Sequence, residues 1–226
     1  MAGRVMRLTV FSIALLLGVA RLYAGGWAVV TVEELPEFVR AGQPFELSYA
    51  VRQHGVTLMS KLDGRLTARL GTDVVSVRAT PLPQAGYYTA TVTLPREGRW
   101  AVQINHGFGT FFELPPSEIL AVARSATAPP PAPVAERGQH LFVAKGCVTC
   151  HVHEAVGGES LSVGPDLTGL RRGRADVERL LTPGFAASQG SKRIQMPDLG
   201  LQAGEIEALA TFLDTMPGGG QLTKAR

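Results

Sequence analysis

Four prolines and no charged residue fall within ten consecutive positions near the middle of the chain, residues 125–134. Proline fixes φ and has no backbone N–H, so this segment can form neither a helix nor a central strand. A stiff, extended spacer between two folded units is the expected result. We therefore predict one domain at residues 25–124 and a second at residues 135–226, each with a core of its own.

Residues 1–24 have the features of an export signal. Arg4 and Arg7 precede an apolar stretch, Leu8–Ala20, and small residues follow it. As a helix this stretch would span roughly 20 Å, short of the ~30 Å hydrocarbon core of a bilayer, and Arg21 ends it. We expect either a cleaved signal peptide or a retained N-terminal anchor, which would serve as a membrane tether. The rest of the protein is then expected in the periplasm or on the outer face of the cytoplasmic membrane.

The distribution of charge excludes nucleic acid as an expected partner. The formal net charge of +3 arises from the three arginines in residues 1–24, which contain no acidic residue. Residues 25–134 hold nine basic and nine acidic side chains, and residues 135–226 hold ten of each. No basic stripe remains that would attract a phosphate backbone.

The half before the spacer has the pattern of a β domain. Apolar and polar residues alternate most clearly in residues 45–51, 88–94 and 100–104, and sequences rich in glycine and proline separate these stretches. About seven strands with turns at this spacing predict an antiparallel sandwich of the immunoglobulin type. Such a fold does not by itself indicate a function.

The only two cysteines lie in one motif, Cys147-Val148-Thr149-Cys150-His151. C-x-x-C-H is the pattern for covalent attachment of a c-type haem. Two thiols on one helical turn can each add to a haem vinyl group, and the adjacent histidine can then ligate the iron. Two alternatives are open. One is a structural or redox disulfide, of which the thioredoxin-like kind would need a strand before Cys147. The other is a zinc site, which would have only His140 and His153 as spare ligands nearby.

The half after the spacer has helical spacing. Gly138 and Phe142 lie one turn apart, and glycine allows another helix to approach closely. A second helix near the C-terminus is indicated by apolar residues at Ile206, Leu209, Ala210, Phe212 and Leu213.

These features resemble the class I c-type cytochromes over residues 135–226. The resemblance is carried, in the order of that family, by residues 138–147, Gly164-Pro165-Asp166-Leu167-Thr168-Gly169, Met196-Pro197-Asp198-Leu199-Gly200-Leu201 and 205–213. It implies an all-α fold in which an N-terminal helix crosses a C-terminal helix. It also implies one haem c, attached through Cys147 and Cys150.

The resemblance implies His151 and Met196 as the axial ligands of the haem iron. Met196 stands in a proline-containing loop before the last helix, where the family places its distal ligand. Met216 follows that helix in a glycine-rich tail. His140 and His153 are weaker rivals, because each is too close in sequence to the proximal side to reach the opposite face of the haem easily.

Pro165 resembles the family's proline whose carbonyl accepts the second ring N–H of the proximal histidine. A centre with two protein ligands passes electrons and leaves no open position for bond chemistry, so we do not expect an enzyme. We expect an exported carrier that transfers single electrons to or from a membrane respiratory complex. The alternatives are a fixed electron-transfer subunit of an oxidoreductase, and a sensor or oxidase-assembly factor linked to haem or copper.

Two dense clusters of positive charge precede the expected ligand loop. They would bind the haem propionates or surround the exposed haem edge as a docking surface, or they are ordinary solvated charge. Their members are Arg171, Arg172, Arg174, Lys192 and Arg193.

The first half resembles, less specifically, the YtkA-like and FixH-type exported domains. The resemblance rests on residues 40–44, 51–56, 86–90 and Gly26-Trp27-Ala28-Val29. Some of these relatives occur beside respiratory oxidases and copper-handling proteins. Imidazole and thioether suit copper, so His54, Met59 and His106 form a candidate copper site. The alternative is that they are surface or turn residues of a docking or spacer domain.

Overall fold

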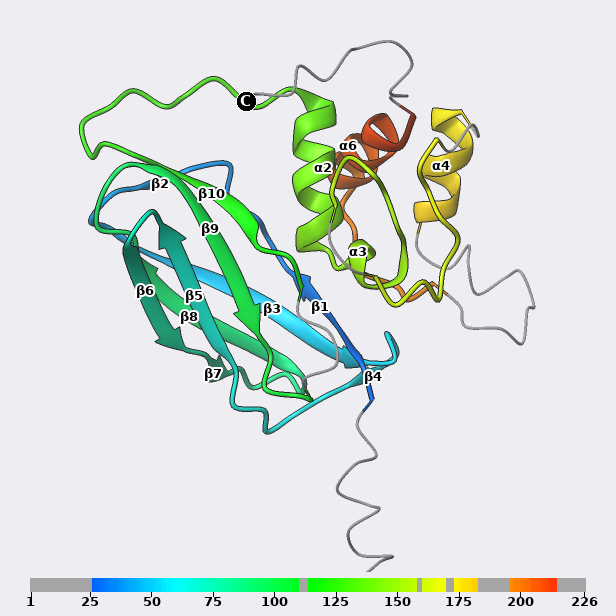
Figure 1. Ribbon diagram of the computed structural model, residues 1–226, viewed down its shortest axis with the longest axis horizontal. Helices are drawn as coiled ribbons and strands as arrows, with labels where there is room; N and C mark the ends of the chain where they lie inside the picture. Colours follow the sequence, from blue (N-terminus) through cyan, green and yellow to red (C-terminus); the bar gives the residue numbers. More distant parts are fainter. Residues whose placement is uncertain (1–25, 110–113, 158–159, 170–172, 183–195, 215–226) are drawn as a thin grey trace, which may run out of the picture.

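The computed structural model of the chain describes residues 26–109, 114–157, 160–169, 173–182 and 196–214. Two layers of strands come first, and a group of helices lies beside them (Figure 1). The predicted spacer, residues 125–134, contains neither helix nor strand up to residue 133, and its last residue begins a helix.

The N-terminal half is built from two sheets of five strands each. One sheet has the order β1-β3-β8-β7, with β4 paired to the end of β3; its strands are β1 (Ala28–Val32), β3 (Pro44–Gln53), β4 (Thr57–Leu58), β7 (Thr80–Pro81) and β8 (Tyr87–Thr93). The other sheet has the order β2-β10-β9-β5-β6; its strands are β2 (Val39–Arg40), β5 (Arg65–Leu70), β6 (Asp73–Arg78), β9 (Gly98–Asn105) and β10 (Ser117–Val122).

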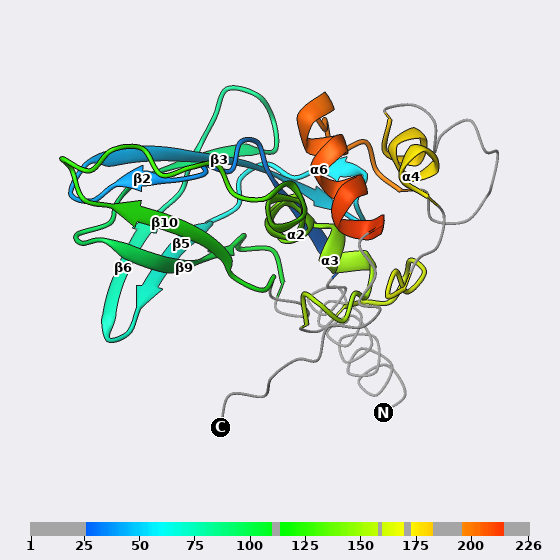
Figure 2. The same cartoon turned by 90° about the horizontal axis from the view of Figure 1, so that it is seen from above.

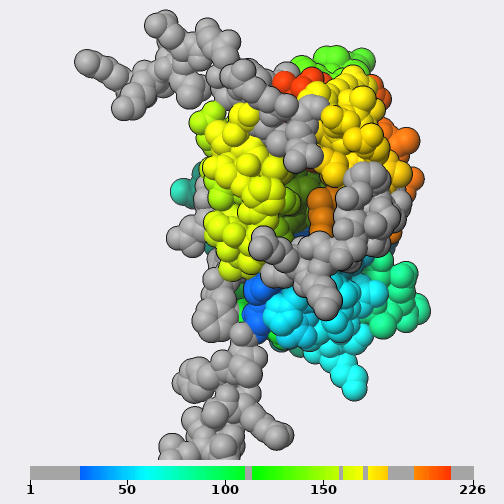
Figure 3. Space-filling model, turned by 90° about the vertical axis from the view of Figure 1, so that its right-hand side faces the viewer, coloured from blue at the N-terminus to red at the C-terminus, as the bar shows by residue number. Residues whose placement is uncertain are grey.

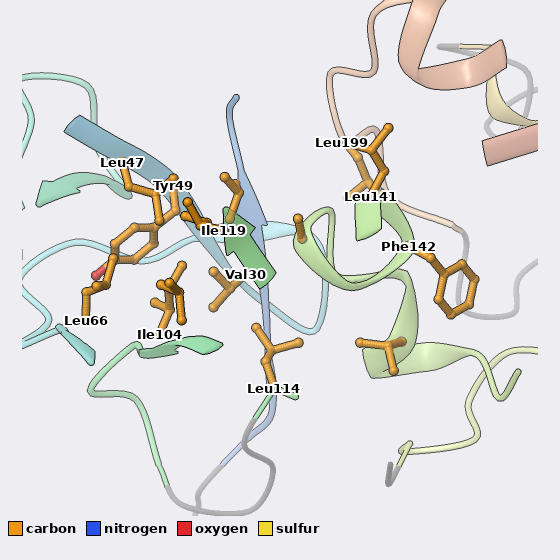
Figure 4. Packing of buried hydrophobic residues seen from close by; sticks show 14 of the residues in the cluster. Val30, Leu47, Tyr49, Leu66, Ile104, Leu114, Ile119, Leu141, Phe142 and Leu199 are labelled. Atoms are coloured by element: carbon orange, nitrogen blue, oxygen red, sulfur yellow. The ribbon is translucent and has the colours of Figure 1, made fainter. Parts of the chain in front are cut away.

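The predicted alternation decides which side chains enter the core between these sheets. Leu47, Tyr49 and Val51 of β3 are buried, and so are the alternate residues of β8 and β9. Leu47 pairs with Ala90 and Tyr49 with Tyr88, so apolar side chains of neighbouring strands share one face. Figure 4 shows this packing, with side chains of both sheets gathered in one cluster.

Two details differ from the expected antiparallel sandwich of about seven strands. The described residues form ten strands, of which β2, β4 and β7 have two residues each. In addition, β2 pairs with β10 in a parallel direction. The reason is the path of the chain, which leaves β1 in one sheet, runs briefly along the edge of the other as β2, and returns as β3. An edge position tolerates so short a strand.

Regular structure after residue 133 is entirely helical within the described part of the chain. The helices are α2 (Val134–Ala144), the single turn α3 (Cys147–Cys150), α4 (Arg174–Leu181) and α6 (Ala203–Asp214). Helix α2 packs against α6, which also contacts α4. Seen from above, α2 lies next to the strands and α4 lies farthest from them (Figure 2).

Gly138 marks the point where α2 and α6 come closest. A Cβ at this position would collide with the backbone oxygen of Ala208 and would lie 2.7 Å from the Cβ of Phe212. Phe142, one turn further along α2, packs edge-on against the Phe212 ring, with the ring centres 5.8 Å apart. The prediction that Gly138 permits a close helix approach is confirmed.

The two halves meet at the end of α2. The Lys145 side chain is 2% exposed, and its Nζ lies 2.8 Å from Oε1 of Glu205 at the start of α6. The same ammonium donates a hydrogen bond of 2.8 Å to the backbone oxygen of Glu33, which follows β1. The Thr31 hydroxyl donates to the backbone oxygen of Lys145 at 3.5 Å. One buried lysine therefore joins α2, α6 and the β-sandwich.

No helix in the described ranges is long and apolar enough to cross a membrane. The predicted export segment at residues 1–24 lies outside the described residues. The same holds for Met216 and for four members of the positive clusters: Arg171, Arg172, Lys192 and Arg193.

Candidate haem site

A sharp turn after α2 presents the two cysteines. Lys145 ends α2, Gly146 takes a left-handed conformation with φ of 79°, and α3 begins at Cys147. A side chain at Gly146 would be strained at this φ and would also collide with Val30 of β1. The single helical turn that follows brings the Cys147 and Cys150 side chains to the same side of the chain.

His151 is held by the segment that follows the motif. Its Nδ1 lies 2.9 Å from the backbone oxygen of Pro165, so a proton on Nδ1 can be donated to that carbonyl. The backbone N–H of Gly164 donates to Cys150 O at 2.9 Å and keeps this segment in place. A Cβ at Gly164 would lie only 2.5 Å from the imidazole ring. This arrangement leaves Nε2 of His151 free to ligate a metal.

Cys147, Cys150, His151 and Met196 line one cleft, with an empty volume of about 720 Å³ that includes space open to solvent. Most of the remaining lining is apolar or glycine and comes from Gly146, Val163, Gly164, Pro165, Pro197 and Leu199. The β-sandwich supplies three more lining residues: Trp27, Val29 and His54. In Figure 3 the hollow lies between the segments near residues 165 and 200, directly above the strands.

These residues fit a covalently bound haem. Two thiols, an oriented imidazole and a thioether share a largely apolar cleft, which is the donor set and the surroundings that a c-type haem needs. Burial raises the pKa of the Cys147 thiol to about 12 and also raises the pKa of Cys150. Both thiols are therefore protonated at neutral pH, whereas redox-active cysteines have lowered pKa values.

The structure disfavours the two alternatives for the motif. A helix precedes Cys147 where a thioredoxin-like disulfide would need a strand. In the described part of the chain, no three His, Cys, Asp or Glu side chains gather closely enough to hold a metal ion.

The rival ligands His140 and His153 do not line the cleft. His153 is buried between aromatic rings, with ring centres 5.9 Å from Phe142 and 4.5 Å from Phe212. Burial lowers the pKa of its imidazole, and its Nδ1 accepts the N–H of Ala155 at 3.3 Å.

The three residues of the predicted copper site, His54, Met59 and His106, lie in different surroundings. His54 lines the haem cleft and packs edge-on against Trp27, with ring centres 5.4 Å apart. His106 directly follows β9 of the opposite sheet and accepts the backbone N–H of Phe108 through Nδ1. Met59 donates its backbone N–H to Val51.

Arg174 is the one described member of the positive clusters, and it has carboxylate partners. Its Nε lies 2.7 Å from Glu178, and its terminal nitrogen lies 3.0 Å from Glu207 of α6. It thus connects α4 to α6, a structural role that the sequence does not predict.

Sequence reasoning missed the part that the β-sandwich plays in the cleft. Trp27 and His54 lie more than ninety residues before Cys147, and no spacing rule connects them to the motif. Lys145, which lies within the cytochrome-like stretch 138–147 and ends α2, also has no separate prediction from the sequence.

A set of two cysteines, an oriented histidine and an apolar cleft defines a protein that carries a covalent haem. The cytochrome c family model matches residues 135–217, so this part of the chain is a cytochrome c domain. The domain binds haem covalently through its cysteines, and its activity is electron transfer. The match begins at residue 135, so the resemblance of the first half to YtkA-like and FixH-type domains stays a prediction.

No curated protein matches the sequence. Among solved structures, a trypsin-activated alpha-2-macroglobulin from Escherichia coli is 20% identical, with a TM-score of 0.34, over 43% of this chain and 7% of that chain. A superoxide reductase (neelaredoxin) from Ignicoccus hospitalis is 22% identical, with a TM-score of 0.28, over 44% of this chain and 83% of that chain. Both likenesses are too distant to indicate a function.

Proposed function

We propose that the protein is an exported monohaem cytochrome c that carries single electrons to or from a membrane respiratory complex, with His151 and Met196 as axial ligands. The observation that carries this proposal is the shared cleft, in which Met196 lies with the C-x-x-C-H motif and with a histidine held at Nδ1 by Pro165. The ligand roles follow the family resemblance residue by residue, and the cleft geometry supports them.

Each side chain of the cleft has a separate task. Cys147 and Cys150 hold the haem as thioethers, and the Pro165 carbonyl fixes the orientation and tautomer of His151. Met196 would hold the iron as its second protein ligand and would keep exogenous ligands away. The bound haem supplies a one-electron Fe(II)/Fe(III) couple. The thioether ligand and the apolar wall both favour the reduced state, since burial disfavours the extra charge of Fe(III).

The division of the chain belongs to this proposal. Residues 25–124 form the β-sandwich domain, 125–134 the spacer, and 135–226 a cytochrome domain of the class I all-α type. An export signal or anchor at residues 1–24 would deliver the protein to the periplasm, where c-type haem is attached and where a respiratory complex is accessible.

The proposal is tested with optical spectra of the haem-loaded protein, oxidised and reduced, for wild type and Met196→Ala. We expect a low-spin spectrum with a weak far-red charge-transfer band in wild type, and loss of that band in the variant. Met216→Ala is the matched control and should keep it. A band that survives in Met196→Ala would remove Met196 from the iron, and a high-spin wild type would favour ligand sensing over electron transfer.

A further inference from the structure

We propose that the β-sandwich domain is a structural wall of the haem site, which closes the cleft with Trp27 and braces the loop that carries Met196 through the turn at His54 and Gly55. This inference rests on the proposed function, because support of the Met196 loop matters to the haem only if Met196 is an iron ligand. It gives the first domain a role beyond that of a spacer.

The first contact lies at the cysteine side of the cleft. Gly146, directly before Cys147, is pressed against β1, where an added Cβ would meet the Val30 carbonyl and lie 2.6 Å from Cγ1 of Val29. Val29 itself lines the cleft. The strand therefore sets the position of the residue from which the haem-binding turn begins.

The second contact lies at the methionine side. Gly55 is buried against Pro197, so that an added Cβ would be 3.3 Å from the proline Cγ. Pro197 directly follows Met196, and both line the cleft. The same domain thus touches both sides of the cleft, one residue away from a cysteine that holds the haem and one residue away from the candidate distal ligand.

The turn that reaches Pro197 is itself tied to Trp27. His54 and Gly55 both have positive φ, 52° and 74°, and the N–H of Val56 closes the turn on Gln53 O at 3.0 Å. Such a conformation is costly for a residue with a side chain, so it persists where surrounding contacts hold it. Here the backbone N–H of His54 donates to Trp27 O at 3.0 Å, and the two rings pack edge-on.

The arrangement predicts a specific defect when the wall is weakened. The Met196 loop loses its support, so a small ligand from solvent competes more successfully for the iron. If Trp27 and Gly55 only stabilise the sandwich, their substitution would lower the stability of the protein and leave its affinity for the small ligand unchanged.

The experiment is a titration of the full-length ferric holoprotein with imidazole, followed by the shift in the Soret band. In Trp27→Ala and Gly55→Ala we expect the Kd for imidazole to fall by roughly 10- to 100-fold, the range seen when groups that position metal ligands are removed. Trp27→Phe, which keeps an aromatic wall, should restore a Kd close to that of wild type.

Gly42→Ala is the matched control for Gly55→Ala. Gly42 has a similar φ of 70°, but an added Cβ there would meet only a guanidinium nitrogen of Arg124 at 3.7 Å. Far-UV circular dichroism confirms folding of each variant, and Gly55→Ala tests the wall by itself where Trp27→Ala fails to fold. The proposal is overturned if the folded cleft variants bind imidazole no more tightly than Gly42→Ala. The proposed function fails separately, on the wild-type spectrum without imidazole.

Discussion

Lys145→Met should lower the free energy of unfolding more than the loss of any exposed ion pair described in this structure. The Lys145 ammonium and the Glu205 carboxylate are 2.8 Å apart, with side chains 2% and 9% exposed. Removal of the lysine leaves a buried carboxylate without its counter-charge, and it leaves the Glu33 carbonyl without a donor. Glu205 makes a further contact, because its Oε2 accepts the N–H of Gln202, the residue directly before α6.

The magnitude follows from distance and burial. Two unit charges 2.8 Å apart attract by about 6 kcal/mol at an effective dielectric constant of about 20. Desolvation of both groups offsets much of this attraction, but loss of a single partner restores none of the desolvation cost. We therefore expect Lys145→Met to lower the free energy of unfolding by about 3–5 kcal/mol. The double variant Lys145→Met/Glu205→Gln should lose less than the sum of the single changes, because no unpaired charge is left.

The assay is urea unfolding of the holoprotein with two probes. Trp27 and Trp100 are the only tryptophans, so fluorescence reports the β-sandwich, while haem absorbance reports the cytochrome domain. The two transitions should coincide in wild type and separate in Lys145→Met. Arg78→Met is the control, since its pair with Asp63 is as short, at 2.7 Å, but about 70% exposed, and should cost about 0.2–1 kcal/mol. A loss in Lys145→Met no larger than in this control would refute the reasoning.

Three further changes test the core and the site. Gly138→Ala should destabilise the protein by about 1–3 kcal/mol or more in thermal unfolding, since its methyl group would collide with the α6 backbone. Tyr49→Phe should be neutral or stabilising, because the Tyr49 hydroxyl is buried with no hydrogen-bond partner among the described residues; Tyr88→Phe should cost about 1–3 kcal/mol in the same melts, since its hydroxyl has two partners. Gly164→Ala should reduce the low-spin fraction in the optical spectrum of the holoprotein, because its Cβ would displace the His151 ring.

These predictions are checked by a control variant and by the pH dependence of stability. Gly204→Ala is the control for both glycines, because its Cβ would meet only a guanidinium 3.9 Å away, and it should be slightly stabilising. Burial raises the pKa of Tyr49 above its ordinary value of 10.0. Stability tied to this phenol is therefore fully present below about pH 10 and is lost as the pH rises further, a loss that Tyr49→Phe should abolish. An alkaline loss that is the same in both proteins would contradict this assignment.

Local patterns predicted the elements and most of the core. The alternation in residues 45–51, 88–94 and 100–104 fixed which side chains of β3, β8 and β9 are buried, because a strand turns every second residue to the same face. Gly138 was predictable from helical spacing, since a glycine on the apolar face of a helix indicates a close neighbour. The parallel pairing of β2 was not predictable, because two residues carry no periodicity and their partner, β10, lies some eighty positions away.

The same distinction separates the two parts of the haem site. The cysteines and His151 form a contiguous motif whose chemistry fixes its spacing, and the hydrogen-bond acceptor for His151 at Pro165 lies only 14 residues further on. Trp27 and His54 reach the cleft through the docking of one folded domain on another, which depends on the shapes of two finished surfaces. The sequence did contain one sign of that docking in Lys145. A lysine between an apolar helix face and a haem motif can be buried only if a carboxylate and a carbonyl meet it there, and these come from α6 and from the end of β1. Lys145, which makes the polar contact at the domain interface, is thus adjacent in the chain to the turn that begins the haem motif. A change that loosens the interface should therefore also alter the haem site.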